Sequence, residues 1–372
     1  MNLKISTSTL VNKMLNLKRN SASRDLDLLF VMPGAHAVKF LTLFKIIRSK
    51  KISYLLAIHN LSLFHRFLLL INRAPLIKIG EMSITNGNPK KINNYKIAKY
   101  LLNTLHPKLL ITSTDPEKKT LPFIEQAKLN NIKTITIQHG AYSTIKGADF
   151  TSEIALVWGS YYKTWFVNKL NKNPSKLLIT GSPFFDKYRI KPYQQVSKKI
   201  NKTRVLILLT FYPNLKRDLD KELSVLIHDL TGIGIGEVLV RPHPWQKLDK
   251  NIFLISQGAK IKEATSKSLI NYLRYADAVI TLDTTAGFDA LIMGKPTIYW
   301  NFDKHEALPL EAGGVPVGRT PKQIASALLG IVSGKLNIND RKRRILLREI
   351  FYKLDGKSSL RVANVIADFL KK

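Results

Sequence analysis

The chain has 372 residues, of which 45% are hydrophobic, so it is long enough for two α/β domains and too apolar for a disordered protein. It contains no cysteine, which excludes disulfides, thiolate metal sites and thiol nucleophiles and fits a reducing cytoplasm. Its 59 Lys and Arg residues against 26 Asp and Glu residues give a formal net charge of +33.

The positive charge has three interpretations. It reflects a genome-wide bias toward Lys, Ile and Asn, or a surface that rests on anionic lipid at about 1 kcal/mol per basic residue, or a nucleic-acid interface. The basic residues are spread along the whole chain, and we find no RNP-type aromatic motif and no zinc-finger spacing. We therefore favour the first two interpretations and expect no nucleic acid as a partner.

Short apolar runs alternate with amphipathic segments along the chain, which predicts an α/β class with parallel sheets. Residues 1–24 form a basic tail without a continuous apolar segment, so we expect no secretory signal, and no segment reaches the ~18 apolar residues of a membrane span. In the first half, we expect strands at residues 26–32, 52–58, 109–112, 134–137, 154–158 and 177–180, and helices at 38–49, 61–71, 122–130 and 161–170. In the second half, we expect strands at residues 205–210, 237–241, 278–282 and 297–300, and helices at 218–231, 266–275, 321–333 and 339–353.

The two halves predict two Rossmann-like, doubly wound domains at residues 25–190 and 204–334. The polar, basic stretch at residues 191–203 is the expected linker, and residues 335–372 are C-terminal helices that we expect to cross back to the first domain. Such folds bind ligands at the carboxyl ends of their strands, so we expect a central cleft that both domains face.

The segment at residues 279–300, VITLDTTAGFDALIMGKPTIYW, has the pattern of strand, tight turn, helix and strand. Thr284, Thr285 and Ala286 fall at the expected helix start, where free N–H groups and hydroxyls suit a phosphate. Asp289 lies about one turn further in, where a carboxylate can accept the two hydroxyls of a ribose. The segment therefore predicts a nucleotide donor, although a capped helix of an ordinary α/β protein would look similar.

Two histidine motifs follow expected strands. In Gln138-His139-Gly140 the imidazole could be a general base or a phosphate ligand, or a turn histidine bound to backbone. Glu153 is a second candidate for the base.

In the second motif, Arg241-Pro242-His243-Pro244, two prolines stiffen the turn. A guanidinium and an imidazole there suit a phosphate that becomes a leaving group, and the alternative is a rigid turn with a solvated arginine. Neither acidic nor His-rich clusters have metal-ligand spacing, so we expect a reaction without metal or cofactor.

Five segments in order resemble bacterial surface-polysaccharide glycosyltransferases of the GT-B fold: IQHG at residues 137–140, LVWGS at 156–160, ITGSPFFD at 179–186, RPHP at 241–244 and TLDTTAGFDALIMGKP at 281–296. The nearest groups are the capsule and lipopolysaccharide transferases that use CMP-activated acidic sugars, and the CDP-glycerol polymerases of teichoic acid synthesis. The resemblance covers about residues 26–300.

The resemblance implies roles for single residues. His243 would contact the donor phosphate, Thr284 and Thr285 would hold the phosphate or base, Asp289 would bind the ribose, and His139 would lie on the acceptor domain. The chain departs from the family in two respects, because the hydroxyl pair is usually rich in serine and the ribose carboxylate is commonly Glu.

The sequence therefore predicts a cytoplasmic, metal-independent glycosyltransferase that works at the inner face of the plasma membrane. Its partners would be a nucleotide-sugar donor, a glycan or lipid-linked acceptor, and an anionic membrane surface. The alternatives are a CDP-glycerol-type glycerophosphotransferase, a nucleotide-sugar 2-epimerase on the same fold, and a basic membrane- or nucleic-acid-binding module. An epimerase would need acid/base carboxylates in the first domain, where this chain has Gln138-His139-Gly140.

Overall fold

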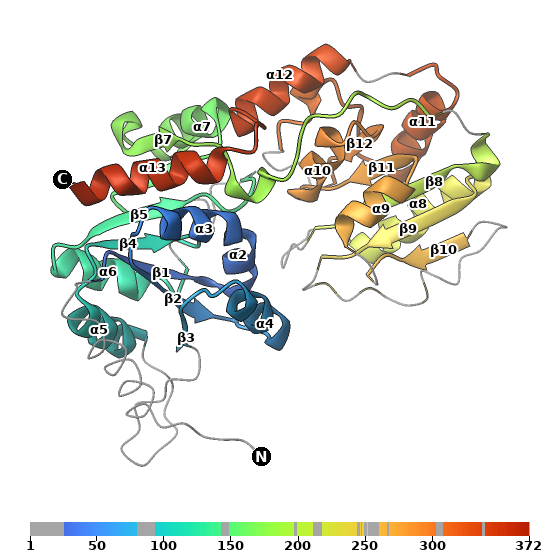
Figure 1. Ribbon diagram of the computed structural model, residues 1–372. Helices are drawn as coiled ribbons and strands as arrows, with labels where there is room; N and C mark the ends of the chain where they lie inside the picture. Colours follow the sequence, from blue (N-terminus) through green and yellow to red (C-terminus); the bar gives the residue numbers. More distant parts are fainter. Residues whose placement is uncertain are drawn as a thin grey trace, which may run out of the picture. The chain divides into compact units, whose positions relative to one another are not determined.

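A computed structural model describes residues 26–79, 94–115, 117–142, 149–196, 199–210, 218–243, 260–265, 268–302, 308–336 and 339–371, together with Gln246, Leu248 and Asn251. The basic tail expected at residues 1–24 lies outside these ranges. The chain forms two compact units, the first from Met1–His139, Lys146–Lys187 and Asp355–Lys372, and the second from Gly140–Ile145 and Tyr188–Leu354. Each unit is built on one parallel sheet with helices packed against it (Figure 1).

The first unit contains a seven-stranded sheet in the order β3-β2-β1-β4-β5-β6-β7, in which every neighbouring pair is parallel. The strands are β1 (Leu28–Pro33), β2 (Tyr54–His59), β3 (Leu76–Lys78), β4 (Leu109–Thr112), β5 (Lys133–Ile137), β6 (Ile154–Val157) and β7 (Leu177–Ile179). The helices are α2 (Gly34–Lys39), α3 (Leu41–Ser49), α4 (Leu63–Ile71), α5 (Asn94–Leu105), α6 (Leu121–Leu129), α7 (Ser160–Leu170) and α13 (Ser358–Lys371).

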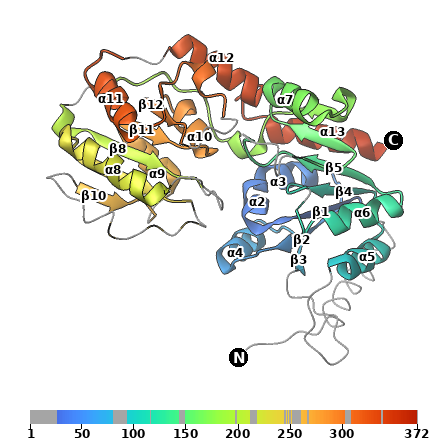
Figure 2. The same cartoon turned by 180° about the vertical axis from the view of Figure 1, so that it is seen from behind.

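Alternate residues of the central strands of this sheet enter two different cores, because successive side chains of a strand point to opposite faces. Leu28, Phe30 and Met32 of β1 pack under α2, α3 and α13, whereas Leu29 and Val31 pack under α5 and α6. Figure 2 shows α3 and α13 on one side of the sheet and α5 and α6 on the other. A sheet covered on both faces explains why its strands are continuous apolar runs.

Helix α13, at the C-terminal end of the chain, belongs to the first unit. Its residues Val362, Ala363 and Ile366 are buried in the core formed with α2 and α3. The start of α13 is fixed by Asp186, whose carboxylate accepts the backbone N–H groups of Ser358 and Ser359, each at 2.8 Å.

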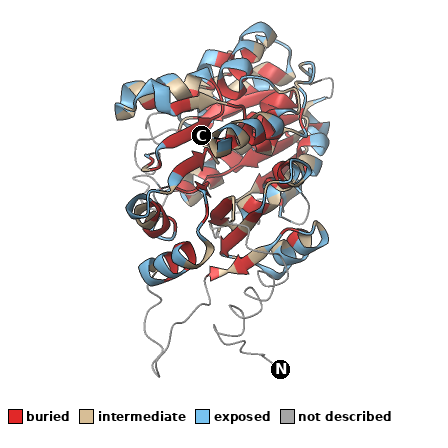
Figure 3. Ribbon diagram, turned by 60° about the vertical axis from the view of Figure 1, so that its left-hand side comes forward, coloured by how far each residue is buried: buried red, intermediate tan, exposed pale blue. Residues whose placement is uncertain are grey.

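The second unit contains a six-stranded parallel sheet in the order β10-β9-β8-β11-β12-β13. The strands are β8 (Arg204–Leu208), β9 (Glu237–Arg241), β10 (Lys260–Glu263), β11 (Ala278–Thr281), β12 (Thr297–Trp300) and β13 (Val317–Gly318). The helices are α8 (Leu219–Gly232), α9 (Leu269–Tyr275), α10 (Ala286–Ile292), α11 (Pro321–Val332) and α12 (Asp340–Phe351). Helices α8 and α11 cover one face and α9 and α10 the other. Figure 3 shows the buried residues on the strands and on the helix sides turned toward them.

Part of the stretch expected as a linker lies along the second unit. The N–H of Lys191 donates to Ile292 O at 2.8 Å, and that of Gln194 donates to Gly294 O at 2.7 Å. Gly294 has a φ of +73°, and a Cβ there would lie 1.9 Å from Pro192 O, so only glycine allows this approach.

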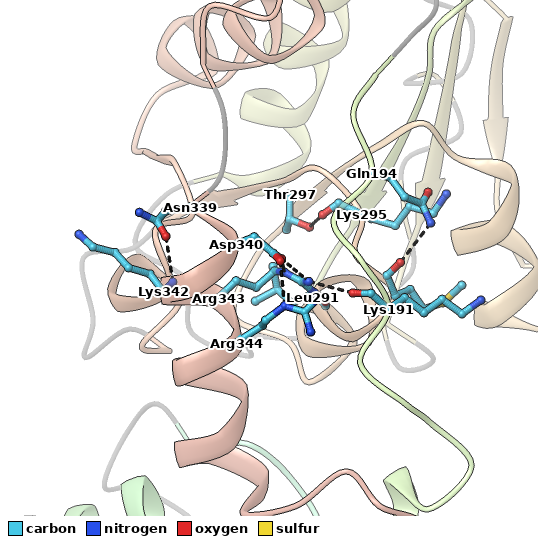
Figure 4. Close-up of polar contacts among 11 residues, drawn as sticks. Lys191, Gln194, Leu291, Lys295, Thr297, Asn339, Asp340, Lys342, Arg343 and Arg344 are labelled. Carbon is cyan, nitrogen blue, oxygen red and sulfur yellow. Dashed lines mark hydrogen bonds and ion pairs between the residues drawn. The ribbon is translucent and has the colours of Figure 1, made fainter.

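A buried arginine ties three segments of the second unit together. The side chain of Arg343 in α12 is fully buried and donates to Leu291 O, to Lys191 O and to the carboxylate of Asp340. Figure 4 shows this guanidinium between α12, the end of α10 and the chain at Lys191. A charged group is tolerated in this place because oxygens surround it.

The element boundaries differ from the expectations in two respects. The single helix expected at residues 38–49 is two helices, α2 and α3, because the backbone leaves helical geometry at Phe40. Helix α5 and strands β3, β10 and β13 were not expected from the sequence. The strands expected at residues 109–112, 237–241 and 297–300 are observed at those positions.

Candidate functional site

Three histidines lie where strands of the first sheet end. His59 is the last residue of β2, His36 lies in α2 directly after β1, and His139 follows the end of β5 by two residues. Strands β2, β1, β4 and β5 are consecutive neighbours in one parallel sheet, so their carboxyl ends share one edge. This edge is where α/β sheets bind ligands. The sequence pointed to His139, whereas His36 and His59 became visible only through the strand order.

The rings of His36 and His139 are stacked, with centroids 4.8 Å apart. Ser113, which follows β4, contacts both rings: its hydroxyl lies 2.9 Å from His36 Nδ1, and its backbone hydrogen-bonds His139. Ser113 itself is buried. Two elements far apart in the sequence are thereby held in a defined orientation at the sheet edge.

Burial and neighbouring cations lower the pKa values of these histidines. The pKa of His36 falls to about 2 because of burial and the charges of His139, Lys39 and His59. The pKa of His139 falls to about 4 because of burial and the charge of Lys39, although a hydrogen bond that its ring donates to the backbone of Ser113 opposes this shift. Both rings are therefore neutral at pH 7, which is the form in which an imidazole accepts a proton.

His59 is 1% exposed, and among the described residues neither of its ring nitrogens has a hydrogen-bond partner. Burial and the charge of Lys119 lower its pKa to about 4. The Thr114 hydroxyl at the end of β4 is also buried without a partner in the described part of the chain. Buried polar atoms are nearly always hydrogen-bonded in folded proteins, so unsatisfied ones at a ligand-binding edge mark a candidate contact region.

The other two predicted site residues of the first unit, Gln138 and Glu153, lie in different surroundings. Gln138 is buried, and its side-chain oxygen accepts the N–H of Trp158 at 3.0 Å while its backbone oxygen accepts the indole N–H at 2.8 Å. Glu153 is exposed at the amino end of β6, and its N–H donates to Thr134 Oγ1 at 2.9 Å. His139 follows the opposite end of the neighbouring strand β5, so the structure does not bring Glu153 and His139 together.

Asp115 follows the end of β4 by three residues and is buried. It accepts hydrogen bonds from the backbone N–H and the hydroxyl of both Thr151 and Ser152, at 2.6 to 2.9 Å. Oδ2 accepts three of these bonds and Oδ1 accepts one, so the carboxylate of Asp115 holds the chain at Thr151 and Ser152.

The second candidate region is the carboxyl edge of the second sheet. Arg241 is the last residue of β9, and its guanidinium donates to Ala264 O at 2.6 Å and lies 5.7 Å from the centre of the Tyr272 ring. His243 follows two residues later and is partly buried, which lowers its pKa. Burial also lowers the pKa of Arg241. Pro244 lies outside the described residues.

Thr284 and Thr285 directly precede α10 and follow β11, which is separated from β9 by the single strand β8. Adjacent strands are about 4.8 Å apart, so the two motifs start roughly 10 Å from each other along one sheet edge. Gly287 allows α10 to lie directly on β11, since a Cβ there would be 2.8 Å from Thr281 Oγ1.

The start of α10 differs from the expectation of free N–H groups. The N–H groups of Gly287 and Phe288 donate to the carbonyls of Thr284 and Thr285, because the chain forms tight turns there. The Ala286 N–H makes a long 3.4 Å contact with Thr284 Oγ1. Thr285 Oγ1 accepts the N–H of Ala141 at 3.2 Å, within the same unit, and a Cβ on Gly140 would lie 3.9 Å from this oxygen. The donors that could bind a phosphate at the start of α10 are therefore mainly hydroxyl groups.

Asp289 is 8% exposed in the first turn of α10. Its carboxylate hydrogen-bonds Tyr188, and this bond, together with burial and the negative charge, raises the pKa of the tyrosine.

No group of three or more His, Cys, Asp or Glu side chains in the described ranges could hold a metal ion. No helix in those ranges is long and apolar enough to cross a membrane.

The sequence matches no protein family model and no curated protein sequence. Solved structures do match. UDP-GlcNAc 2-epimerase from Neisseria meningitidis, bound to UDP-GlcNAc, is 13% identical with a TM-score of 0.67 over 92% of this chain and 100% of its own. The calicheamicin glycosyltransferase CalG4 is 13% identical with a TM-score of 0.58 over 94% and 99%, and MurG from Acinetobacter baumannii is 12% identical with a TM-score of 0.55 over 92% and 99%. The expected fold is confirmed: the chain has the GT-B fold, with two Rossmann-like domains.

Proposed function

We propose that this chain is a glycosyltransferase that moves a sugar from a nucleotide-activated donor to a growing capsule or lipopolysaccharide glycan. The coarse assignment, an enzyme related to nucleotide sugars, is supported by its structural neighbours. Within it, CMP-linked acidic sugars are the donors that we propose first. The second unit would bind the donor, and the first unit would bind the acceptor.

One observation carries the choice of a transferase. The stacked pair of His36 and His139 lies at the carboxyl edge of the first sheet, while the carboxylate of Asp115 accepts four hydrogen bonds from Thr151 and Ser152. Transfer to a hydroxyl needs one base that takes one proton, and a neutral imidazole is suited to that step. We assign His139 as the base, with His36 and Ser113 holding its ring.

On the donor side, positive charge and hydroxyls would stabilise the departing phosphate. His243 and Arg241 would face the oxygen that gains charge, which lowers the barrier directly. Thr284 and Thr285 would donate hydroxyl hydrogen bonds to the phosphate, and Asp289 would accept hydroxyls of the ribose. This proposal uses neither a metal ion nor a cofactor.

We also propose that the enzyme works at the inner face of the plasma membrane on a lipid-linked or anionic acceptor. The formal charge of +33 supports this, because each basic residue near anionic lipid contributes about 1 kcal/mol to binding.

A second candidate function is a nucleotide-sugar 2-epimerase. It is favoured by the TM-score of 0.67 with the Neisseria meningitidis epimerase, which covers 100% of that chain. In that case the chain would convert a free UDP-sugar to its 2-epimer and transfer nothing. Transfer of glycerol phosphate from CDP-glycerol is a further alternative that would use the same groups.

The test begins with thermal unfolding in the presence of CMP, CDP, UDP, GDP and their sugars. A ligand at 100 times its Kd stabilises the protein by about 2.7 kcal/mol, so one nucleotide class should raise the Tm clearly. The matching activated donor is then incubated with membrane glycolipid extracts, and products are separated by mass spectrometry. A glycosylated acceptor supports the proposal, a free epimer supports the second candidate, and no nucleotide binding contradicts both.

A matched pair of variants tests the donor side. His243→Ala should lower turnover by roughly 10²-fold, as loss of an oxyanion donor does. His228→Ala is the control, because His228 is an exposed histidine of α8 in the same unit. Equal rates in the two variants would remove His243 from the mechanism.

A further inference from the structure

Helix α4 exposes an unusual amount of apolar surface for its length. Of its nine residues, five are large apolar side chains that are more than half exposed: Leu63 at 85%, Phe64 at 66%, Phe67 at 60%, Leu70 at 55% and Ile71 at 61%. Monomeric proteins rarely leave contiguous apolar patches of this kind uncovered, and larger ones mark interaction sites.

The five side chains form one stripe. At 100° per residue, they fall within about 120° of the helix circumference, with Phe67 near the middle. Leu69 lies on the other side and is fully buried in the core of the first unit. The helix is therefore fixed by its inner face, and its apolar outer face has no partner among the described residues.

Helix α4 is well anchored in the first unit. The Ser62 hydroxyl caps it by accepting the N–H of His65 at 3.2 Å, and Arg48 from α3 donates to Arg73 O at 3.2 Å just beyond its end. Figures 1 and 2 show α4 beside α2 and β3 at one end of the first sheet. Because the helix is held in place, its five exposed apolar side chains are presented together on one side.

The sequence segment that contains this stripe carries charge of one sign. Residues 28–80 contain no Asp or Glu and eight basic residues: Lys39, Lys45, Arg48, Lys50, Lys51, Arg66, Arg73 and Lys78. Arg66 lies on α4 itself at the side of the stripe, and Arg73 follows the helix by two residues. Apolar side chains with Arg66 and Arg73 beside them match an anionic bilayer, in which acyl chains lie beneath negative headgroups. The same stripe on a second copy of this chain would bring these arginines near arginines of like charge.

We propose that α4 is an interfacial anchor that lies in the plane of an anionic membrane and inserts Leu63, Phe64, Phe67, Leu70 and Ile71 below the headgroups. A nine-residue helix is about 13.5 Å long, so it lies on a bilayer and does not span it.

Helix α4 is joined directly to the carboxyl edge of the first sheet, where His36, His59 and His139 lie and where we propose that the acceptor binds. His59 ends β2 three residues before Ser62, which caps α4. His65 of α4 packs at the start of α2, with its Nδ1 3.3 Å from the Cβ position on Gly34, and α2 carries His36. Binding of α4 to the membrane would therefore hold the carboxyl edge of the first sheet, with its three histidines, near the lipid headgroups. This last step rests on the proposed function, whereas membrane binding itself does not.

The absence of cysteine makes a direct test simple. Phe67→Cys in the full chain is labelled with the fluorophore NBD and mixed with vesicles of phosphatidylcholine alone or with 30% phosphatidylglycerol (roughly the anionic fraction that polybasic surfaces respond to). We expect a blue shift only with the anionic vesicles, and quenching by lipids that carry the quencher about 5–10 Å deep. Leu129→Cys is the control, because Leu129 of α6 is 74% exposed in the same unit and should show no shift.

Flotation of unlabelled protein gives the second measurement. Leu63→Glu together with Phe67→Glu should lower binding to anionic vesicles by roughly tenfold or more, since insertion contributes a large part of interfacial affinity, whereas Leu129→Glu should bind like the wild type. An equal effect of both changes, or no binding by the wild type, would overturn the proposal. Concentration-dependent dimers that the double variant abolishes would assign the stripe to a second copy instead. Each variant is also tested for the nucleotide-induced Tm shift, so a failure of the anchor is distinguished from a failure of the enzymatic assignment.

Discussion

The imidazole rings of His36 and His139 stack with their planes inclined by 29° and with Ser113 in contact with both. The two histidines belong to segments that follow β1 and β5, with β4 between those strands. A proton on His139 makes a second proton on His36 more costly, so the pair takes up at most one charge in mild acid.

The three histidines at the carboxyl edge of the first sheet should make the stability of the protein depend on pH. Their folded pKa values of about 2 for His36 and about 4 for His59 and His139 lie below the ordinary 6.5, so the unfolded chain binds more protons between those values. Stability should therefore fall as the pH drops below about 6.5, by at most about 1.4 kcal/mol per pH unit for each histidine. Urea unfolding midpoints at pH 7.5, 6.0 and 5.0 measure this slope.

One substitution isolates a single contribution to that slope. His59→Leu removes a buried ring whose nitrogens have no partner among the described residues, so the slope should become flatter while stability at pH 7.5 is kept or raised. His228→Leu replaces a histidine whose side chain is 59% exposed and serves as the control for the substitution itself. An unchanged slope in His59→Leu would show that this ring takes up its proton in the folded protein.

Catalysis should depend on pH in a way that follows from the His139 environment. Because its pKa is about 4 in the free protein, kcat/KM should stay level from pH 7 to about 5 and fall tenfold per pH unit below about 4. His139→Asn should lower kcat by roughly 10²-fold and remove this acidic limb. His106→Asn, at an exposed position of the same unit, serves as the control. An acidic limb that survives in His139→Asn would assign the base to another group.

The parts of the fold that the sequence predicts are those with a strong apolar signal. Strands β4 and β12 are fully buried apolar runs with turn residues at their ends, and their boundaries were predicted to the residue. Strand β10, with the sequence KIKE, is an exposed edge strand, and nothing in its composition distinguishes it from a loop. The expected helix at residues 38–49 is broken at Phe40, a change of backbone angle that the apolar pattern does not register.

The sequence proposes site residues where a motif lies at the end of a recognisable strand. His139 and Arg241 are proposed in this way, whereas His36 lies inside a short helix and His59 ends an apolar run. Only the order of β2, β1, β4 and β5 brings these histidines to one edge, and strand order is a long-range property. The first N–H groups of α10 are hydrogen-bonded because the chain makes tight turns at Thr284 and Thr285. A sequence pattern that marks the start of a helix does not specify these turns.

The junction between Asp186 and α13 should contribute measurably to the first unit. Its carboxylate accepts two N–H groups at the helix start and lies at the positive end of the helix dipole. Asp186→Ala should therefore lower the free energy of unfolding by about 1–2 kcal/mol. Asp368→Ala removes an acid of the same helix that is 69% exposed and should change stability by less than about 0.5 kcal/mol. Equal effects in urea unfolding would mean that the cap is replaced by water at no cost.

Arg343 and Arg344 offer a matched comparison, because both bind the carboxylate of Asp340 but only Arg343 is buried. Arg343→Ala would leave the carbonyls of Leu291 and Lys191 without their donor and open a cavity inside the second unit (Figure 4). These effects predict a loss of about 3 kcal/mol in the free energy of unfolding.

The side chain of Arg344 is 39% exposed, so in the alanine variant water can take the place of its bond to Asp340. Arg344→Ala should therefore cost less than about 1 kcal/mol. Because Arg343 also fixes the end of α10, the helix that carries Asp289, Arg343→Ala should reduce the Tm shift by the bound nucleotide, whereas Arg344→Ala should preserve it. If both variants unfold at the same urea concentration, the buried guanidinium contributes no more than a surface ion pair.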